Sequence, residues 1–140
     1  MLDHVSIGVG DLAAAKRFYD ATLQPLGYRC LMPTDGALGY GAESAMFWLL
    51  AAERPVPADP ESGLHFCFVA PTRKSVEDFH KAALAAGGRD HGAPGVRDEY
   101  GPNYFAACVM AGLGPTIQAA VRHKRSRPPP RDGWPGQARP

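Results

Sequence analysis

The sequence repeats itself at one constant offset, and this constrains the fold more than any single motif does. The segments LDHVSIGVGDLAAAKRFY and LHFCFVAPTRKSVEDFH align without a gap when His4 is placed on His65. The same alignment places Gly27 on Gly88, one turn after each apolar run ends. An internal duplication of this kind predicts two copies of one structural unit.

The first half, residues 1–52, predicts a strand, a helix and three further strands. Residues 4–9 alternate and are rich in β-branched side chains, which is typical of a strand. Asp11 is a suitable N-cap for a helix from Leu12, whose apolar periodicity stops at Pro25 and Gly27. Turn residues then separate three short strand candidates within residues 28–51.

Residues 53–63 contain three prolines and predict a linker, after which the second half, residues 64–121, begins again. A strand over 64–69 precedes a helix that Thr72 caps and Gly87 and Gly88 end. Residues 89–103 are mostly turn chemistry around one further strand, and two more strands follow within 103–110 and 116–121. The pattern is again βαβββ.

Composition supports one globular domain over residues 1–121. The chain has 140 residues, of which 45% are hydrophobic, and this is enough to build a core. No apolar run is long enough to cross a bilayer, and the first residues do not form a secretory signal. We therefore expect a cytoplasmic protein with no membrane partner and with reduced cysteines at positions 30, 67 and 108.

Charge divides the chain unevenly. Residues 122–140 hold six of the 15 Lys and Arg residues but one of the 14 Asp and Glu residues. This tail is dense in proline and has no apolar periodicity, so we interpret it as a disordered basic extension. A nucleic-acid-binding arm is the alternative, but we do not expect nucleic acid as a partner.

The alternation of side chains predicts where the two histidines point. If Val5, Ile7 and Val9 pack on the first helix, then His4 points away from it. The same count turns His65 away from the second helix. If the two halves associate about a pseudo-twofold axis with their first strands adjacent, both histidines face a common cleft.

These features together resemble the vicinal oxygen chelate superfamily, the group of glyoxalases, bleomycin-resistance proteins and extradiol dioxygenases. The resemblance rests on the duplication, the pair LDHVSIGV and GLHFCFV, the helix DLAAAKRFYDATLQPLG and the run YGPNYFAA. It implies an α+β fold in which two βαβββ modules form an open, incomplete barrel around a central cleft. It also implies a small-molecule ligand, and a homodimer is common in the family.

The resemblance implies metal ligands on the first and last strands of each module, and these positions hold His4, His65 and Gln118. Trp48 occupies the fourth position, so neither of the carboxylates found in relatives is present. Imidazole and amide donors without a carboxylate bind a hard divalent cation weakly. One divalent metal, Zn, Ni, Fe or Mn, or else no cofactor, is therefore expected.

Four further side chains are candidates for substrate binding: Trp48, Tyr40, Asn103 and Tyr104. An aromatic ring at a former ligand position suits the wall of a ligand pocket, although it also suits a core. For each tyrosine, an ordinary surface or core role is the competing interpretation.

Two functions fit this pattern. The first is a metal-dependent lyase, isomerase or dioxygenase, which needs a base that Gln118 and Trp48 do not supply. The second is a metal-free module that binds a flat or aromatic molecule without turnover.

Overall fold

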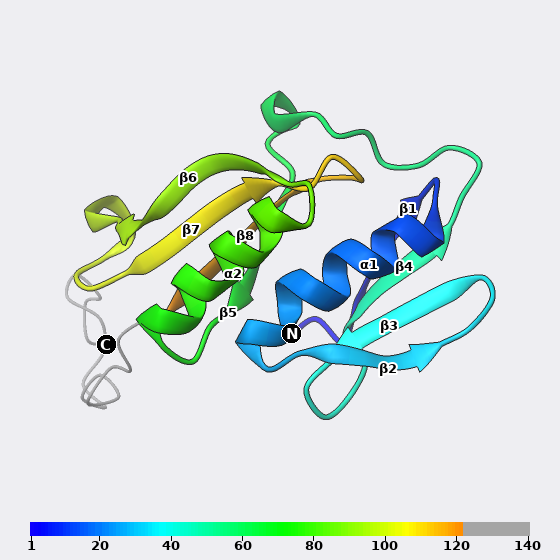
Figure 1. Cartoon of the computed structure of the whole chain (residues 1–140), viewed down its shortest axis with the longest axis horizontal. Coiled ribbons are helices and arrows are strands. Elements are labelled where there is room, and N and C mark those ends of the chain that lie inside the picture. The colour runs from blue at the N-terminus through cyan, green and yellow to red at the C-terminus, as the bar shows by residue number, and fades with distance from the viewer. Residues whose placement is uncertain (122–140) are drawn as a thin grey trace, which may run out of the picture.

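The computed structural model describes residues 1–121, and its two halves have the same order of elements (Figure 1). The first half contains β1 (Val5–Val9), α1 (Leu12–Leu23), η1 (Gln24–Leu26), β2 (Arg29–Pro33), β3 (Ala37–Gly41) and β4 (Phe47–Ala51). The second contains η2 (Pro60–Ser62), β5 (His65–Val69), α2 (Arg73–Ala85), β6 (Arg89–Val96), η3 (Asp98–Tyr100), β7 (Phe105–Met110) and β8 (Thr116–Val121). The predicted α+β fold with two βαβββ modules is confirmed.

Each module forms a four-stranded mixed sheet in which the first strand pairs in parallel with the last. The strand orders are β1-β4-β3-β2 and β5-β8-β7-β6. The two leading strands, β1 and β5, are therefore edge strands of separate sheets and do not pair with each other. Neither sheet closes into a barrel.

Local chemistry fixes both helix starts where the sequence predicts them. The Asp11 side chain accepts a hydrogen bond of 3.0 Å from the backbone N–H of Ala14. Thr72 and Ser75 form a capping box, in which each side chain accepts a bond from the other residue's backbone N–H. These caps satisfy backbone donors that the first helical turn leaves without partners.

A single hydrophobic core joins the two modules. It contains helix-facing side chains from both, among them Ile7, Phe18, Leu49, Phe79 and Ile117. Helices α1 and α2 lie side by side and are in contact (Figure 1). Because the helix-covered faces share this core, the opposite face of each sheet is left outside it.

Aromatic rings complete the junction between the modules. The ring centroid of Phe47 on β4 lies 5.6 Å from that of Phe66 and 5.1 Å from that of Phe68, both on β5. The Tyr28 hydroxyl donates a 2.6 Å hydrogen bond to the backbone carbonyl of Val69, at the end of the same strand. The junction therefore combines apolar packing with a directional bond.

The segment after α2 is more regular than its sequence suggests. Residues 89–96 form the eight-residue strand β6, although its pairing with β7 shifts register between Asp90 and Gly92 and again between Gly92 and Gly95. These irregularities bend the strand away from ideal pairing. The short helix η3 then leads into β7.

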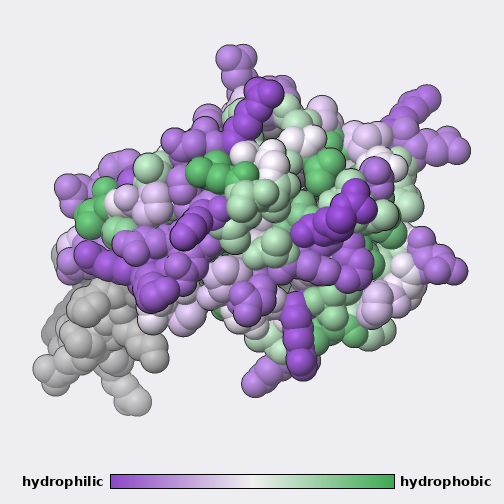
Figure 2. All heavy atoms as spheres, in the orientation of Figure 1, coloured by the Kyte–Doolittle hydropathy of each residue, from purple (hydrophilic) through white to green (hydrophobic). Residues whose placement is uncertain are grey.

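The surface is mixed in character. Hydrophilic side chains cover much of the face seen in Figure 2, with apolar residues between them. Within residues 1–121, no helix is both long and apolar enough to cross a membrane.

Candidate functional site

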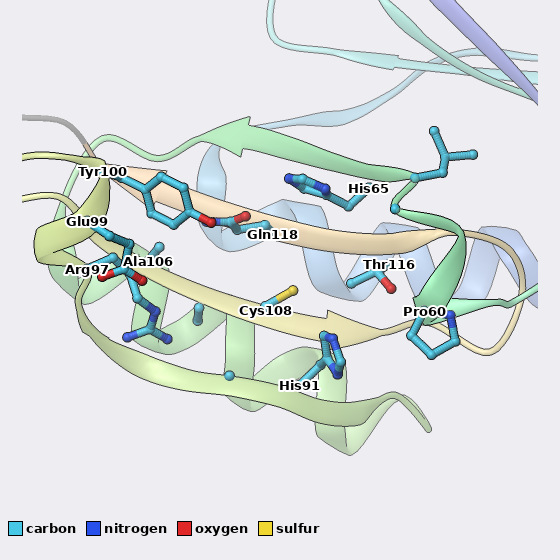
Figure 3. Close-up of a pocket in the computed structure, with 14 residues that line it drawn as sticks. Pro60, His65, His91, Arg97, Glu99, Tyr100, Ala106, Cys108, Thr116 and Gln118 are labelled. Atoms are coloured by element: carbon cyan, nitrogen blue, oxygen red, sulfur yellow. The ribbon is translucent and has the colours of Figure 1, made fainter.

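A cavity of about 270 Å³ lies on the face of the second sheet that points away from α2 (Figure 3). Strands β5, β8, β7 and β6 supply its floor, and η2 and η3 contribute to its walls. The polar and ionisable side chains that line it include His65, His91, Arg97, Glu99, Cys108 and Gln118. All its lining residues lie between Pro60 and Gln118, so one module builds it.

Strand register brings the central side chains of this floor into one row. Gln118 on β8 pairs with Cys67 on β5 and with Cys108 on β7. Next to them, His65 pairs with Thr116. Residues opposite each other in neighbouring strands project on the same face, so an amide, thiols and an imidazole converge here.

Arg97 brings the only guanidinium among the residues that line the cavity. Its side chain is half-buried, and Nη2 donates a 2.6 Å hydrogen bond to the backbone carbonyl of Ala93. This bond holds the side chain against β6, where the backbone is irregular. Arginine stays protonated at any physiological pH, so Arg97 brings one permanent positive charge to the cavity.

The thiol of Cys108 is kept in its neutral form. Burial is the main cause that raises its pKa, and the neighbouring Cys67 raises it further, while Arg97 acts in the opposite direction. The Cys67 Sγ lies 3.7 Å from the Tyr104 hydroxyl oxygen. A thiol whose pKa is raised is a weak nucleophile at neutral pH.

His91 on β6 lines the cavity. The neighbouring Asp90 forms two contacts, together called the clamp, that hold this part of the strand in place. Asp90 Oδ1 lies 2.9 Å from His80 Nε2 on α2 and accepts a 3.0 Å bond from the backbone N–H of Gly92. These contacts lower the pKa of the Asp90 carboxyl, with His80 the larger cause. The clamp ties the irregular part of β6 to the helix behind it.

The corresponding row in the first module has different side chains. Trp48 on β4 pairs with Ser6 on β1 and with Gly39 on β3, in the same register as the row around Gln118. A Cβ atom at Gly39 would lie 2.9 Å from the Trp48 ring, so the glycine makes room for the indole. Trp48 and Gln118 thus occupy equivalent places on the two sheets.

The two histidines predicted as metal ligands lie on different sheets. His65 lines the cavity, whereas His4 precedes β1, and its Nδ1 lies 2.8 Å from a carboxylate oxygen of Asp3. His4 is not among the residues that line the cavity with His65. Of the three predicted ligands, His65 and Gln118 are brought together in one chain.

The four predicted substrate-binding residues do not line this cavity. Trp48 belongs to the first sheet, and Tyr40 faces α1, where its hydroxyl donates a 2.7 Å bond to Asp20. Asn103 sits in the loop before β7 with a φ of 63°. Tyr104 is buried, and its ring packs against Tyr100, with 5.3 Å between centroids.

The side chains that sequence reasoning missed come mainly from β6 and the segment after it. Arg97 and Glu99 carry no motif, and His91 stands in a stretch that looks like a turn. Cys108 offered a usable signal, because alternation along β7 puts it on the same face as Ala106, in register with Gln118.

The donors within one chain do not fit a resident divalent metal. His65 and Gln118 offer one imidazole nitrogen and one amide oxygen, and no carboxylate occupies either of the expected positions. Within residues 1–121, no group of three or more His, Cys, Asp or Glu side chains is placed to hold a metal ion.

Comparison with known proteins identifies the family. A family model described as the Glyoxalase/Bleomycin resistance protein/Dioxygenase superfamily matches residues 1–110, and this chain belongs to that superfamily. The match ends before β8, so Gln118 lies outside it. None of the curated proteins matches.

Solved structures share the fold over nearly the same length. A glyoxalase/bleomycin resistance protein from Albidiferax ferrireducens T118 is similar at 29% identity, with a TM-score of 0.77 over 87% of this chain and 99% of that one. A glyoxalase-related enzyme from Fulvimarina pelagi has 16% identity and a TM-score of 0.65, covering 87% and 88% of the two chains. The fosfomycin resistance protein FosX from Mesorhizobium loti has 12% identity and a TM-score of 0.65, covering 89% and 93%.

Proposed function

We propose that this protein binds a small molecule on the open face of its second sheet. The observation that carries the proposal is the cavity around Gln118, into which an imidazole, a guanidinium, an amide and a thiol converge. Ligand sites are typically concave, with a few well-placed polar groups that fix orientation. A site of this size suits a compact molecule such as a substituted aromatic ring.

We further propose that a second copy of the chain closes the cavity. The open face of the first sheet exposes Met32 (51%) and Leu50 (38%) beside the half-buried Trp48. An apolar face of this kind is commonly covered by a partner. Because the two sheets have equivalent strand orders, the first sheet of one copy would lie over the second sheet of another.

This arrangement makes the apolar face of the first module a lid for the polar face of the second. Trp48 of one copy then adds an aromatic ring to the wall of the cavity, while His65 and Gln118 of the other supply hydrogen-bonding groups. Tryptophan is well suited to this place, since its large ring buries much area against a flat ligand.

Binding without turnover is favoured over metal-dependent catalysis. Proton abstraction needs a base at the reacting carbon, and neither Gln118 nor Trp48 takes up a proton at neutral pH. The enzyme remains a second candidate because two of the three predicted ligands, His65 and Gln118, do share the cavity. His4 from a second copy would then be the third ligand.

Amide chemical shifts of the full-length protein test the binding proposal. A fragment set of substituted benzenes should shift the backbone signals of Gln118, Cys108 and Gly92, which lie in or beside the cavity. Fragments that shift only residues on the helix-covered faces, or no residue, would contradict the proposal.

Light scattering after gel filtration tests the dimer. Met32→Glu places a charge on the open face of the first sheet and should convert a dimer into a monomer. Leu84→Glu is the matched control, because Leu84 is an exposed leucine on α2, away from that face, and should leave the dimer intact. A wild-type protein that is monomeric at all accessible concentrations would refute this part.

Metal analysis separates the two candidate functions. Protein purified from medium supplemented with Zn, Ni, Fe and Mn is expected to carry no stoichiometric metal. A stoichiometric divalent metal that is lost in both His4→Ala and His65→Ala would instead support the enzyme with a site shared by two copies.

A further inference from the structure

Arg97 carries a positive charge that no described carboxylate neutralises. Among the ion pairs formed within residues 1–121 none involves Arg97, and the one hydrogen bond of its side chain goes to a neutral carbonyl, that of Ala93. The side chain is nevertheless half-buried in the cavity wall. A partly desolvated cation without a counter-charge favours the binding of an anion.

Two glycines leave the guanidinium room to lie against β6. A Cβ atom at Gly95 would stand 3.0 Å from Arg97 Nη1, and one at Gly92 would stand 3.3 Å from Nη2. Both distances are tighter than ordinary contacts. The register shifts of β6 occur at these same glycines, so the irregular strand forms a seat for the Arg97 side chain.

The seated guanidinium retains most of its donors. Arginine has five N–H groups, and the described contacts of Arg97 use one of them, on Nη2. Figure 3 shows Arg97 and His91 on one side of Cys108, with His65 and Gln118 on the strands across from them. A ligand lying over Cys108 therefore meets the fork of Arg97 at one end and the imidazole of His65 and the amide of Gln118 at the other.

Glu99 lines the same cavity, and its carboxylate repels an anion. The two charges differ in burial: Glu99 is exposed to solvent, whereas Arg97 is half-buried. Solvent screens an exposed charge more strongly than a half-buried one. Glu99 therefore weakens anion binding without reversing its sign.

We propose that Arg97 determines the ligand class of the cavity and selects a small molecule bearing an oxyanion, either a carboxylate or a phosphonate. The planar guanidinium fork matches two oxygens of either group through charge-assisted hydrogen bonds. This inference rests on the proposed function, because it assigns the ligand of the same cavity. Arg97 acts here as a binding and specificity residue, and no covalent step is involved.

Three probes of similar size test this assignment with the full-length protein. Benzoate and phenylphosphonate carry the two oxyanions, while benzamide is a neutral counterpart of benzoate. Calorimetry at low ionic strength, with amide shifts to locate binding, should show both anions binding at least about tenfold more tightly than benzamide. The tighter of the two anions identifies the oxyanion that the site prefers.

Substitutions at the two charged positions should act in opposite directions. Arg97→Gln should weaken the binding of both anions about tenfold or more and leave benzamide binding unchanged. Arg97→Lys keeps the charge but loses the fork, so it should fall between the two. Glu99→Gln should strengthen anion binding about threefold, and this variant does not depend on the Arg97 contact with β6.

The outcomes separate this inference from the proposed function. Equal binding of benzoate and benzamide in the cavity of the wild-type protein would overturn the role of Arg97 and leave the cavity as a ligand site. That role is also overturned if Glu99→Gln leaves the benzoate affinity unchanged and Arg97→Lys binds as well as wild type. Absence of any shift at cavity residues with all three probes would end both proposals.

Discussion

The open faces of the two sheets are built on one pattern of pairing but present opposite chemistry. In the first module, the central row is Ser6, Trp48 and Gly39, and the indole lies over the glycine. In the second module, the equivalent row has Gln118 between two cysteines, with a cavity above it. In the first sheet an indole therefore occupies the place that lies beneath a cavity in the second sheet.

The helix-covered faces of the same sheets have not diverged in this way. Leu49 and Ile117 lie on the faces opposite these rows, and both are fully buried in the shared core. Packing therefore constrains one face of each sheet strongly and leaves the side chains of the other face free to differ.

Truncation in the core should be costly in either module. Leu49→Ala and Ile117→Ala each remove a fully buried side chain and should lower the free energy of unfolding by about 2–5 kcal/mol. Because both residues belong to one core, urea denaturation should show a single transition in each variant. Two separate transitions would show that the modules unfold independently, contrary to the shared core.

Exchanging the central residue should convert the second face to the type of the first. In Gln118→Trp the indole fills the space above the sheet, so we expect benzoate binding to become undetectable by calorimetry. Position 118 lies beside Cys108, whereas Trp48 in the first sheet lies beside Gly39. The introduced indole should therefore be overpacked and should lower the free energy of unfolding by about 1–3 kcal/mol. Gln118→Asn, which shortens the amide without filling the cavity, is the control and should retain measurable binding.

The contacts of Asp90 with His80 and with the Gly92 N–H predict an acid sensitivity in the second module. The first module has no equivalent pair. The pKa of the Asp90 carboxyl is lowered by His80 and by the Gly92 N–H, so the charged form stabilises the fold at pH values above the unfolded-state value of about 4. That contribution is lost as the pH falls below about 4. Under the repeat alignment, Tyr19 and Arg29 stand where His80 and Asp90 stand, and they form no such pair.

Asp90→Asn provides the measurement. Between about pH 4 and pH 2 the free energy of unfolding of the wild type should fall more steeply than that of Asp90→Asn. Asp78→Asn, on the exposed side of α2, is a control for the general effect of removing a carboxylate. Parallel pH profiles for wild type and Asp90→Asn would refute the clamp as a source of acid sensitivity.

The smallest effect is expected from moving Arg97 without removing it. In Gly95→Ala the new methyl group stands 3.0 Å from Nη1, so the flexible guanidinium must shift by a few tenths of an ångström. Benzoate should bind about threefold more weakly, with little change in melting temperature. Gly36→Ala, in an open turn of the first module, is the matched control and should leave affinity unchanged.

The fold followed from the sequence because its signals are local and doubled. Asp11 and Thr72 mark helix starts, Gly27 and Gly88 follow helix ends, and strand alternation correctly turned His65 away from its helix. Because the two halves are repeats, the secondary structure predicted for each half supported the prediction for the other. Strand β6 was the hardest element to predict, since its glycines disrupt the alternation that marks a strand.

The site was harder to predict because it depends on which faces of the modules meet. Alternation placed His4 and His65 on equivalent faces, but it carries no information on whether those faces share a cleft within one chain. Packing between α1 and α2 decides this, and it turns the two open faces to separate places. The sequence did not indicate Arg97 as a site residue, because the position of its side chain depends on two register shifts in β6 and on the backbone carbonyl of Ala93.

The hydrogen bond from Tyr28 to Val69 uses an acceptor on the exposed edge of β5. Ala70 N–H is bonded to Ala120 on β8, so the preceding carbonyl, that of Val69, points to the unpaired side of β5. A strand from another molecule that added to this edge would need that oxygen, and Tyr28 already occupies it. The Tyr28 hydroxyl therefore blocks one of the acceptors that edge-to-edge strand addition at β5 would use.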